Sequence, residues 1–238
     1  MNSTENVAEP NWVLFEDEHV LVVNKPAEIA SQGRRGEDSV EERVRRRIDP
    51  NDPSGVFLGM PQRLDRPVTG VLIFAKTPKA ARRLAEGFAE RTVRKEYWAI
   101  VEGLPEPSEG FWDDWLLEER GTNKNPATKV VAEGTSKARN ALTRYRRENI
   151  DPLVCHRSWL RLWPETGRRH QLRAQLAARG TPIVGDRKYG ARQTFAVGIA
   201  LHARRFTFTH PTLFESVTII ADPPSAWSGA GFEFDPTD

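Results

Sequence analysis

The chain has 238 residues, of which 38% are hydrophobic and 29% charged, as is typical of a globular protein rather than a disordered one. Its longest apolar run, at 71–75, is much shorter than the roughly 20 residues of a membrane-spanning helix, and the N-terminus does not resemble a signal peptide. A single cysteine, Cys155, excludes an internal disulfide framework and a cysteine-based zinc cluster. We therefore expect a cytoplasmic protein with no membrane partner.

Charge is distributed unevenly along the chain. All 35 lysines and arginines lie between residues 21 and 205, where 23 acidic residues leave an excess of 12 positive charges, whereas both ends are acidic. A basic body of this kind suits RNA or DNA, because neutralisation of phosphates dominates such binding. The same charges could equally cover an ordinary solvated surface, so charge alone leaves the partner open.

Hydrophobic patterning predicts many strands and few helices. In chain order, strands are expected at residues 12–15, 20–23, 70–75, 96–101, 129–132, 141–146, 159–163, 199–209 and 216–221. Helices are expected at 40–48, 78–90 and 168–179. The helix at 78–90 has Thr77 as its N-cap and Pro78 as its first residue.

The strands do not alternate regularly with the helices, which favours one mixed α+β domain. We expect this domain at 12–222, between a flexible acidic segment at 1–11 and an acidic tail at 223–238. The stretch 104–157 has the weakest pattern, with clusters of glycine, proline and charge.

The segment Pro61-Gln-Arg-Leu-Asp-Arg-Pro-Val-Thr-Gly70 leads into the buried strand at 70–75. Asp65 lies between Arg63 and Arg66, whose guanidinium groups favour an ionised carboxylate. Such an anion is a poor general acid but a usable nucleophile or base. The alternative is a loop aspartate that arginine holds for structural reasons only.

Two further segments contain candidate residues. On the predicted helix at 168–179, Arg173 lies on the partly apolar face, so it either pairs with a distant carboxylate or extends its charged head to water. On the predicted strand at 96–101, Tyr97 shares a face with Lys95 and either stacks on a nucleobase or belongs to the core. The five histidines show no close pairing, so no metal site is expected.

In this order and spacing, the three segments resemble the signatures of the RluA-type family of RNA pseudouridine synthases. Those signatures are His-Arg-Leu-Asp-x-x-Thr-Ser-Gly, a Tyr-x-Ala strand and Gly-Arg-x-His-Gln-Leu-Arg. The likeness includes residues 22–26, 182–186 and 201–203, and so extends over about 12–222. It implies a compact member without an S4-type RNA-binding domain, built on a central, mostly antiparallel sheet with flanking helices and loops.

The resemblance implies an isomerase that flips a uridine out of structured rRNA or tRNA and converts it to pseudouridine without a cofactor. Asp65 is then catalytic, attacking C1′ or C6 or taking a proton from the sugar, with Tyr97 packed on the base and Arg173 paired with Asp65. RNA binding and base flipping are implied for Arg63, Arg66, Arg168, Arg169 and His170. Pocket positions are implied for Leu64, Leu172 and Gly70.

The chain departs from the first signature at Gln62, Pro67, Val68 and Thr69, which leaves the target RNA open. A second hypothesis is an RNA-binding protein that uses the same cleft and has lost catalysis. A third, a metal-dependent nuclease or glycosidase, requires clustered carboxylates or histidines that the sequence does not display. We expect a monomer with no obligatory protein partner.

Overall fold

The computed structural model describes residues 12–34, 37–119, 126–150, 156–229, 231–232 and 234. The helices are α1 (Val40–Ile48), α2 (Pro78–Ala89) and α3 (Gln171–Ala178), with short 3-10 turns at Pro53–Gly55, Arg187–Tyr189 and Ser225–Trp227. The strands are β1 (Val13–Glu16), β2 (Val20–Lys25), β3 (Thr69–Ala75), β4 (Arg94–Glu102), β5 (Glu109–Glu118), β6 (Thr128–Val131), β7 (Arg139–Ile150), β8 (Arg157–Pro164), β9 (Leu201–Thr209) and β10 (Ser216–Ile220).

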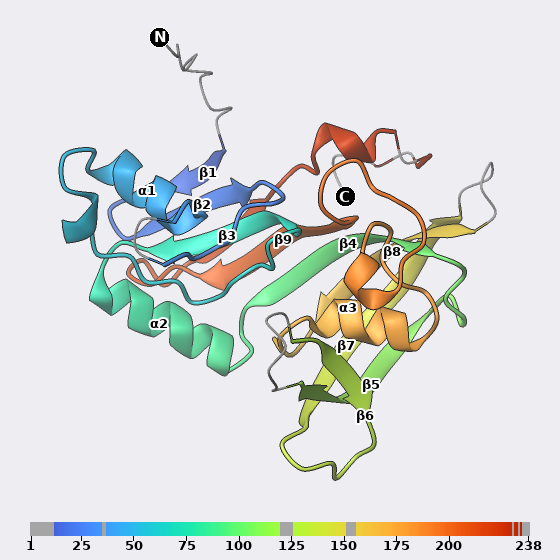
Figure 1. Cartoon of the computed structure of the whole chain (residues 1–238). Helices are drawn as coiled ribbons and strands as arrows, with labels where there is room; N and C mark the ends of the chain where they lie inside the picture. The colour runs from blue at the N-terminus through green and yellow to red at the C-terminus, as the bar shows by residue number, and fades with distance from the viewer. Residues whose placement is uncertain are drawn as a thin grey trace.

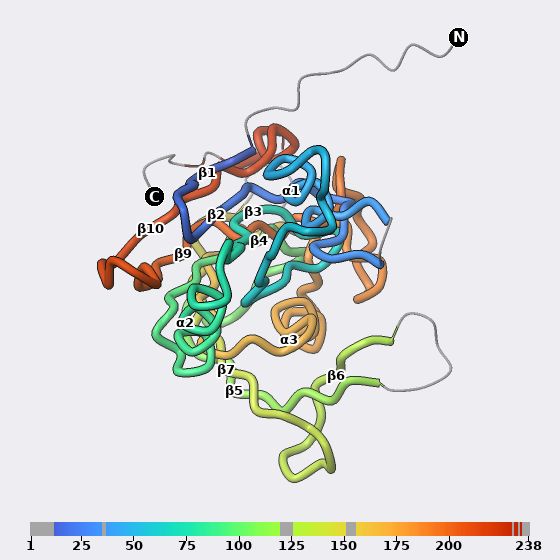
Figure 2. Tube along the Cα trace, turned by 90° about the vertical axis from the view of Figure 1, so that its left-hand side faces the viewer, coloured from blue at the N-terminus to red at the C-terminus, as the bar shows by residue number. Residues whose placement is uncertain are grey.

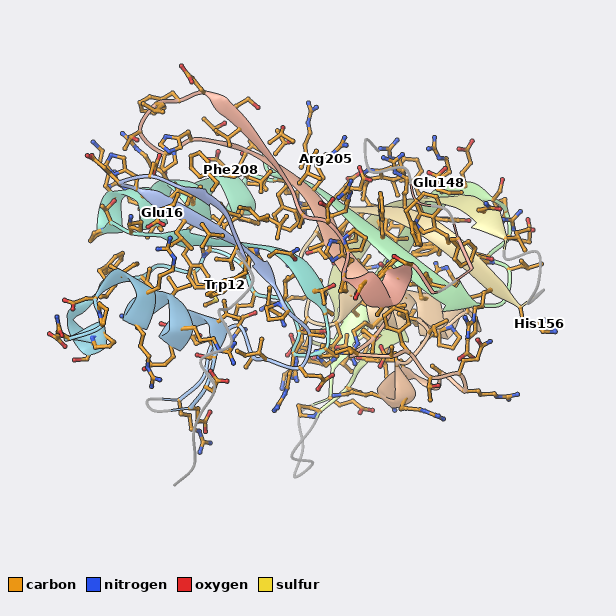
Figure 3. All side chains as sticks on the ribbon, turned by 90° about the horizontal axis from the view of Figure 1, so that it is seen from above. Trp12, Glu16, Glu148, His156, Arg205 and Phe208 are labelled. Atoms are coloured by element: carbon orange, nitrogen blue, oxygen red, sulfur yellow. The ribbon has the colours of Figure 1, made fainter. Side chains whose placement is uncertain are left out.

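The strands form one 10-stranded sheet in the order β1-β2-β3-β9-β4-β8-β7-β5-β6, with β10 paired to β9 (Figure 1). Among the pairings of the described strands, only the short one between β3 and β9 is parallel. Viewed from above, Glu16 on β1 and Glu148 on β7 lie in opposite halves of the sheet (Figure 3). The prediction of an α+β domain with a mostly antiparallel sheet is confirmed.

Strand β3 lies between two layers of apolar side chains, which explains its continuous apolar sequence. Leu72 and Phe74 pack in a cluster with Val40 and Val44 of α1. The alternate residues of β3 pack in the main core with residues of α2. Because successive side chains of a strand point to opposite faces, a strand covered on both faces must be apolar throughout.

The expected bounds are confirmed for α1 and, within one residue, for α2. Ser39 caps α1 by accepting from the Glu42 amide at 3.2 Å, and Thr77 caps α2 by accepting from the Ala80 amide at 3.2 Å. Helix α3 begins three residues later than expected, because His170 has the left-handed φ of 52° and ends the preceding loop. Arg168 and Arg169 therefore lie on a loop and not on the helix.

Two parts of the chain differ from expectation. Strand β5 was not expected, and it pairs with β7 and β6 in an extension that projects beneath α3 (Figure 2). An acidic tail was expected at 223–238, but the described part of this segment packs on the core. Trp227 is 1% exposed, and the ring of Phe234 stacks on Trp98 at 5.6 Å, so burial of aromatic surface holds this acidic segment on the core.

Among the described residues, none of the helices has the length and apolar character needed to cross a membrane.

Candidate active site

The loop 62–68, which contains Asp65, is held mainly through its backbone. The Ser31 hydroxyl donates to the Leu64 carbonyl at 2.7 Å and accepts from the Leu64 amide at 3.0 Å. The Ile199 amide donates to the Pro67 carbonyl at 3.2 Å. Within the loop, the Val68 amide donates to the Asp65 carbonyl at 3.0 Å. These bonds fix the position from which the Asp65 side chain projects.

Lys25 adds a charged tie to the same loop. Its ammonium is fully buried and donates to three carbonyl oxygens, those of Pro26 and Ile29 at 2.8 Å and that of Arg66 at 3.0 Å. Burial lowers the pKa of Lys25 to about 7, and the negative charge of Asp65 opposes that shift. The lysine therefore connects β2 to the residue directly after Asp65.

The end of the loop enters β3 through a close contact with β9. Gly70 has a φ of 112°, and a Cβ atom there would lie 2.3 Å from the Ala203 carbonyl oxygen. The neighbouring Thr69 hydroxyl bonds Nδ1 of His202 at 2.7 Å. Only glycine fits this backbone position. Gly70, which was predicted as a pocket residue, therefore allows the close approach of β3 to β9 and has no side chain that could line a pocket.

Asp65 meets Arg173 in a three-residue ion-pair chain. The Arg173 guanidinium donates to both carboxylate oxygens of Asp186, at 2.7 and 2.9 Å, and its remaining nitrogen donates to Oδ2 of Asp65 at 2.8 Å. Burial opposes the charge of Arg173, but the two carboxylates raise its pKa above the usual value. The expected pairing of Arg173 with Asp65 is confirmed.

The two ends of this chain differ in exposure. The Asp186 side chain is 2% exposed and the Asp65 side chain 27% exposed. Oδ1 of Asp65 makes no hydrogen bond with any described residue. Asp186 thus holds Arg173 from the buried side, whereas Asp65 is partly exposed and its Oδ1 has no hydrogen bond with the described residues.

His170 lies beside Asp65 rather than on an outer surface. Its Nε2 is 3.7 Å from Oδ2 of Asp65, and its Nδ1 bonds the Tyr189 hydroxyl at 2.8 Å. Burial lowers the pKa of His170, and Arg173 adds to the shift while Asp65 opposes it. His170 is therefore neutral at pH 7. It is a polar neighbour of Asp65 and has no positive charge with which to bind RNA phosphates.

Tyr97 of β4 is the aromatic component of the site. Its ring lies 5.8 Å from that of Phe206, and burial together with the charge of Asp65 raises the pKa of its hydroxyl. Tyr97 is therefore a neutral phenol near Asp65, suited to packing and not to proton abstraction. Leu64 and Leu172 are 6% exposed and belong to the main core, with only their edges available to a pocket.

The candidate RNA-binding arginines differ in how firmly they are held. Arg63 is exposed and makes no hydrogen bond or ion pair with the described residues, in contrast to the rest of its loop. Arg66 donates to the Glu28 carbonyl at 2.9 Å. Arg168 donates to the Asn140 carbonyl at 2.9 Å, and Arg169 is exposed beside His170. Among the described residues, Arg63 is thus an exposed, unbonded side chain on the loop that carries Asp65, and it is free to enter a substrate.

Lys25, Asp186 and Tyr189 are site residues that sequence reasoning did not identify. Lys25 and Asp186 fall in segments that resemble the family, but nothing in their local pattern indicates a role. Tyr189 lies under the guanidinium of Arg173, with 4.9 Å between the guanidinium carbon and the ring centre. That contact depends on the turn 187–189, which has no distinctive sequence signal.

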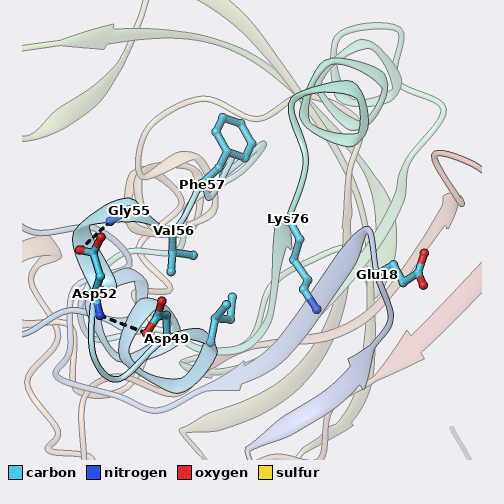
Figure 4. A pocket seen from close by; sticks show the side chains of 8 residues that line it. Glu18, Asp49, Asp52, Gly55, Val56, Phe57 and Lys76 are labelled. Atoms are coloured by element: carbon cyan, nitrogen blue, oxygen red, sulfur yellow. Dashed lines mark hydrogen bonds between the residues drawn. The ribbon is translucent and has the colours of Figure 1, made fainter.

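An open hollow elsewhere on the molecule does not compete with this site. It is lined in part by Glu18, Asp49, Asp52 and Lys76, between the end of α1 and β3 (Figure 4). Three carboxylates against one lysine do not suit a polyanion, and two of them already accept backbone amides. No predicted site residue lines it.

The chain is similar to known proteins in both sequence and structure. The family model for RNA pseudouridylate synthase matches residues 19–178. The dual-specificity RNA pseudouridine synthase RluA of Escherichia coli strain K12 is 35% identical over 218 residues, covering 88% of this chain and 91% of the relative. The solved structure of human RNA Pseudouridylate Synthase Domain Containing 1 superposes with a TM-score of 0.73 at 25% identity, covering 89% of this chain and 83% of that one. Human RNA Pseudouridylate Synthase Domain Containing 4 gives a TM-score of 0.72 at 25% identity, covering 91% and 90%.

Proposed function

The chain belongs to the RNA pseudouridylate synthase family, and we propose that it isomerises uridines of structured RNA with Asp65 as the catalytic carboxylate. One observation carries the assignment to Asp65. Arg173 donates twice to the buried Asp186 and uses its third nitrogen to donate to Oδ2 of Asp65, whose Oδ1 has no hydrogen-bond partner among the described residues. A fixed, ionised carboxylate with one available oxygen is what a nucleophile or base requires.

In the reaction, the N1–C1′ bond of uridine breaks and a C5–C1′ bond forms. C5 loses a proton and N1 gains one, so the composition of the nucleoside does not change and no group is imported. We assign to Asp65 the attack on C1′ or C6, or the removal of a sugar proton. Tyr97 packs on the base, and Arg173 keeps Asp65 ionised when the base excludes water.

The target uridine must leave the RNA stack before it reaches Asp65. Unstacking costs a few kcal/mol, which a side chain that replaces the base can partly offset. We assign this role to Arg63, because it is the exposed and unbonded residue of a loop that is otherwise tied down. Arg66 follows Asp65 and Arg169 precedes His170 in the chain; both are exposed and are proposed to contact RNA phosphates.

The test is release of tritium from RNA that carries uridine labelled at C5, since C5 loses its hydrogen only when it is joined to C1′. We expect release by the parent protein and none by Asp65→Asn. The RNA affinity of Asp65→Asn should be within a few-fold of the parent affinity, because phosphate contacts come from other residues. Asp38→Asn removes an exposed carboxylate from the α1 region and should leave release unchanged. Release by Asp65→Asn at the parent rate would remove Asp65 from catalysis.

We further propose that the protein acts in the cytoplasm as a monomer on stem-loops of rRNA or tRNA, without a cofactor. A single chain supplies Asp65, Tyr97 and Arg173, which supports the monomer. The dual specificity in the name of the Escherichia coli relative supports a substrate range of more than one RNA.

A further inference from the structure

Four cations converge beside the proposed catalytic site and form what we call the basic cluster. Arg91 follows the C-terminal end of α2, Lys95 is on β4, Arg139 begins β7, and Arg168 precedes α3. The elements that carry them are far apart in sequence, and Figure 1 shows the end of α2 and the start of β4 beside the α3 and β7 half of the molecule. The fold brings these charges close enough for Arg91 and Arg168 to act on Lys95, and for Arg139 and Arg91 to act on Arg168.

Within the described ranges, the basic cluster has no carboxylate paired with it. The Lys95 ammonium donates to the Thr166 carbonyl at 3.1 Å, and Arg168 donates to a backbone carbonyl. No member pairs with a carboxylate in the part of the chain that the structure describes. Burial lowers the pKa of Lys95 to about 8, and the positive charges of Arg91 and Arg168 add to the shift. Burial, Arg139 and Arg91 also lower the pKa of Arg168.

The backbone conformation at Arg91 is one that arginine rarely adopts. The Thr92 amide donates to the Gly87 carbonyl at 3.0 Å and the Arg91 amide to the Phe88 carbonyl at 3.4 Å, which is the Schellman pattern of a helix end. Arg91 occupies the left-handed position of that motif with a φ of 61°, where glycine is usual. An arginine side chain is therefore present where the backbone favours glycine, and its positive charge acts on Lys95 and Arg168.

The basic cluster adjoins the catalytic residues on two elements. Lys95 and Tyr97 project from the same face of β4, about 7 Å apart along the strand. The loop that supplies the Thr166 carbonyl and Arg168 continues to His170, whose Nε2 is 3.7 Å from Asp65. An anion bound by the basic cluster would thus lie next to a base packed on Tyr97.

We propose that Arg91, Lys95, Arg139 and Arg168 form a phosphate-binding subsite for the RNA backbone next to the nucleotide held at Asp65. This inference rests on the proposed function, because it takes RNA as the ligand. A phosphodiester supplies the missing negative charge, and its oxygens can accept from an ammonium and from guanidinium groups together.

The test measures binding of a uridine-containing stem-loop RNA, and its turnover by tritium release, for the parent, Lys95→Met and Arg91→Gly. A lost phosphate contact should weaken binding about tenfold and make the slope of log K against log salt shallower by about one. Lys79→Met removes an exposed charge from the other end of α2, about 18 Å away, and should change neither. Arg91→Gly suits the left-handed backbone, so its thermal stability should equal or exceed that of the parent while its binding weakens.

Two further readouts distinguish a phosphate contact from a structural role. Replacing single phosphates near the target uridine by neutral methylphosphonate should weaken binding of the parent at one position and have no further effect on Lys95→Met. Between pH 7 and 9 the affinity of the parent should fall several-fold as Lys95 loses its proton, whereas Lys95→Arg should lack this fall because arginine stays charged. Arg91 and Arg168 are the charged groups that act on Lys95, and arginine side chains keep their charge over this range.

The inference and the proposed function can fail separately. If the parent releases tritium but Lys95→Met and Arg91→Gly bind RNA with the parent affinity and salt slope, the subsite is wrong and the isomerase stands. If the variants bind more weakly with the shallower slope while the parent releases no tritium, the subsite stands and the isomerase is wrong.

Discussion

Arg173→Met should destabilise the protein mainly through Asp186 and not through Asp65. The substitution removes both hydrogen bonds to Asp186, whose side chain is only 2% exposed, and so leaves a buried carboxylate unpaired. Breaking a buried ion pair from one side costs about 3–5 kcal/mol. At about 2–4 °C per kcal/mol for a domain of this size, the melting temperature should fall by roughly 6–20 °C.

The double variant Arg173→Met, Asp186→Ala separates this cost from the loss of catalysis. Because it removes both charges, it should be more stable than Arg173→Met by about 2 kcal/mol or more. The coupling energy in a double-mutant cycle equals this gain plus the cost of Asp186→Ala alone, so it should exceed about 2 kcal/mol. Its activity should stay as low as that of Arg173→Met, since Asp65 has lost its donor in both.

Urea unfolding followed by tryptophan fluorescence measures the four free energies of unfolding, and tritium release measures activity. The cycle requires that all four proteins unfold in one transition with similar denaturant dependence. Additive losses, with the double variant less stable than either single variant, would refute the reasoning that an orphaned Asp186 is the source of the cost.

Other residues give independent predictions. Gly70→Ala should cost more than about 3 kcal/mol in urea unfolding, because the new Cβ meets the Ala203 carbonyl at 2.3 Å and the backbone is left-handed; parent stability would contradict this. Trp227→Ala should cost about 3–5 kcal/mol, since the ring is 1% exposed, and no loss would mean that the C-terminal segment is not part of the core. Burial lowers the pKa of His202 to about 4, so between pH 6.5 and 4 only the unfolded chain binds this proton. The free energy of unfolding should therefore decrease by up to about 3 kcal/mol as the pH is lowered through this range. Urea midpoints should fall less over this range in His202→Gln, and an equal fall would remove His202 as the cause. RNA binding should weaken with salt with a slope of about −3 to −5 for four to six phosphates, and a flat response in filter binding would exclude the basic body as the RNA-binding face.

Elements with local signals could be predicted from the sequence. The Thr77-Pro78 start of α2 works through a side chain that caps an amide three residues away, so everything needed lies within one turn. Strand β5 has no comparable signal. Its burial pattern is irregular and its position depends on β7, some 30 residues further along the chain.

The site was predictable in its parts but not in its connections. Arg173 on a partly apolar face requires a carboxylate, but the sequence does not say which one, because Asp65 lies 108 residues before it and Asp186 13 residues after it. Likewise, the acidity of the C-terminal segment suggested a solvated tail, whereas Trp227 and Phe234 decide its position through contacts with distant strands.

The hydrogen bonds that hold the loop 62–68 in place are made mostly to its main-chain atoms, and they therefore constrain its side chains little. The Ser31 hydroxyl, the Lys25 ammonium and the Ile199 amide bond backbone groups that every residue possesses. Side chains within the loop can therefore be exchanged while its path is retained. The chain itself illustrates such exchange, because Gln62 replaces the histidine of the family signature and donates to the Val71 carbonyl at 3.1 Å. Such a loop can vary in the side chains it offers to RNA while Asp65 stays in one place.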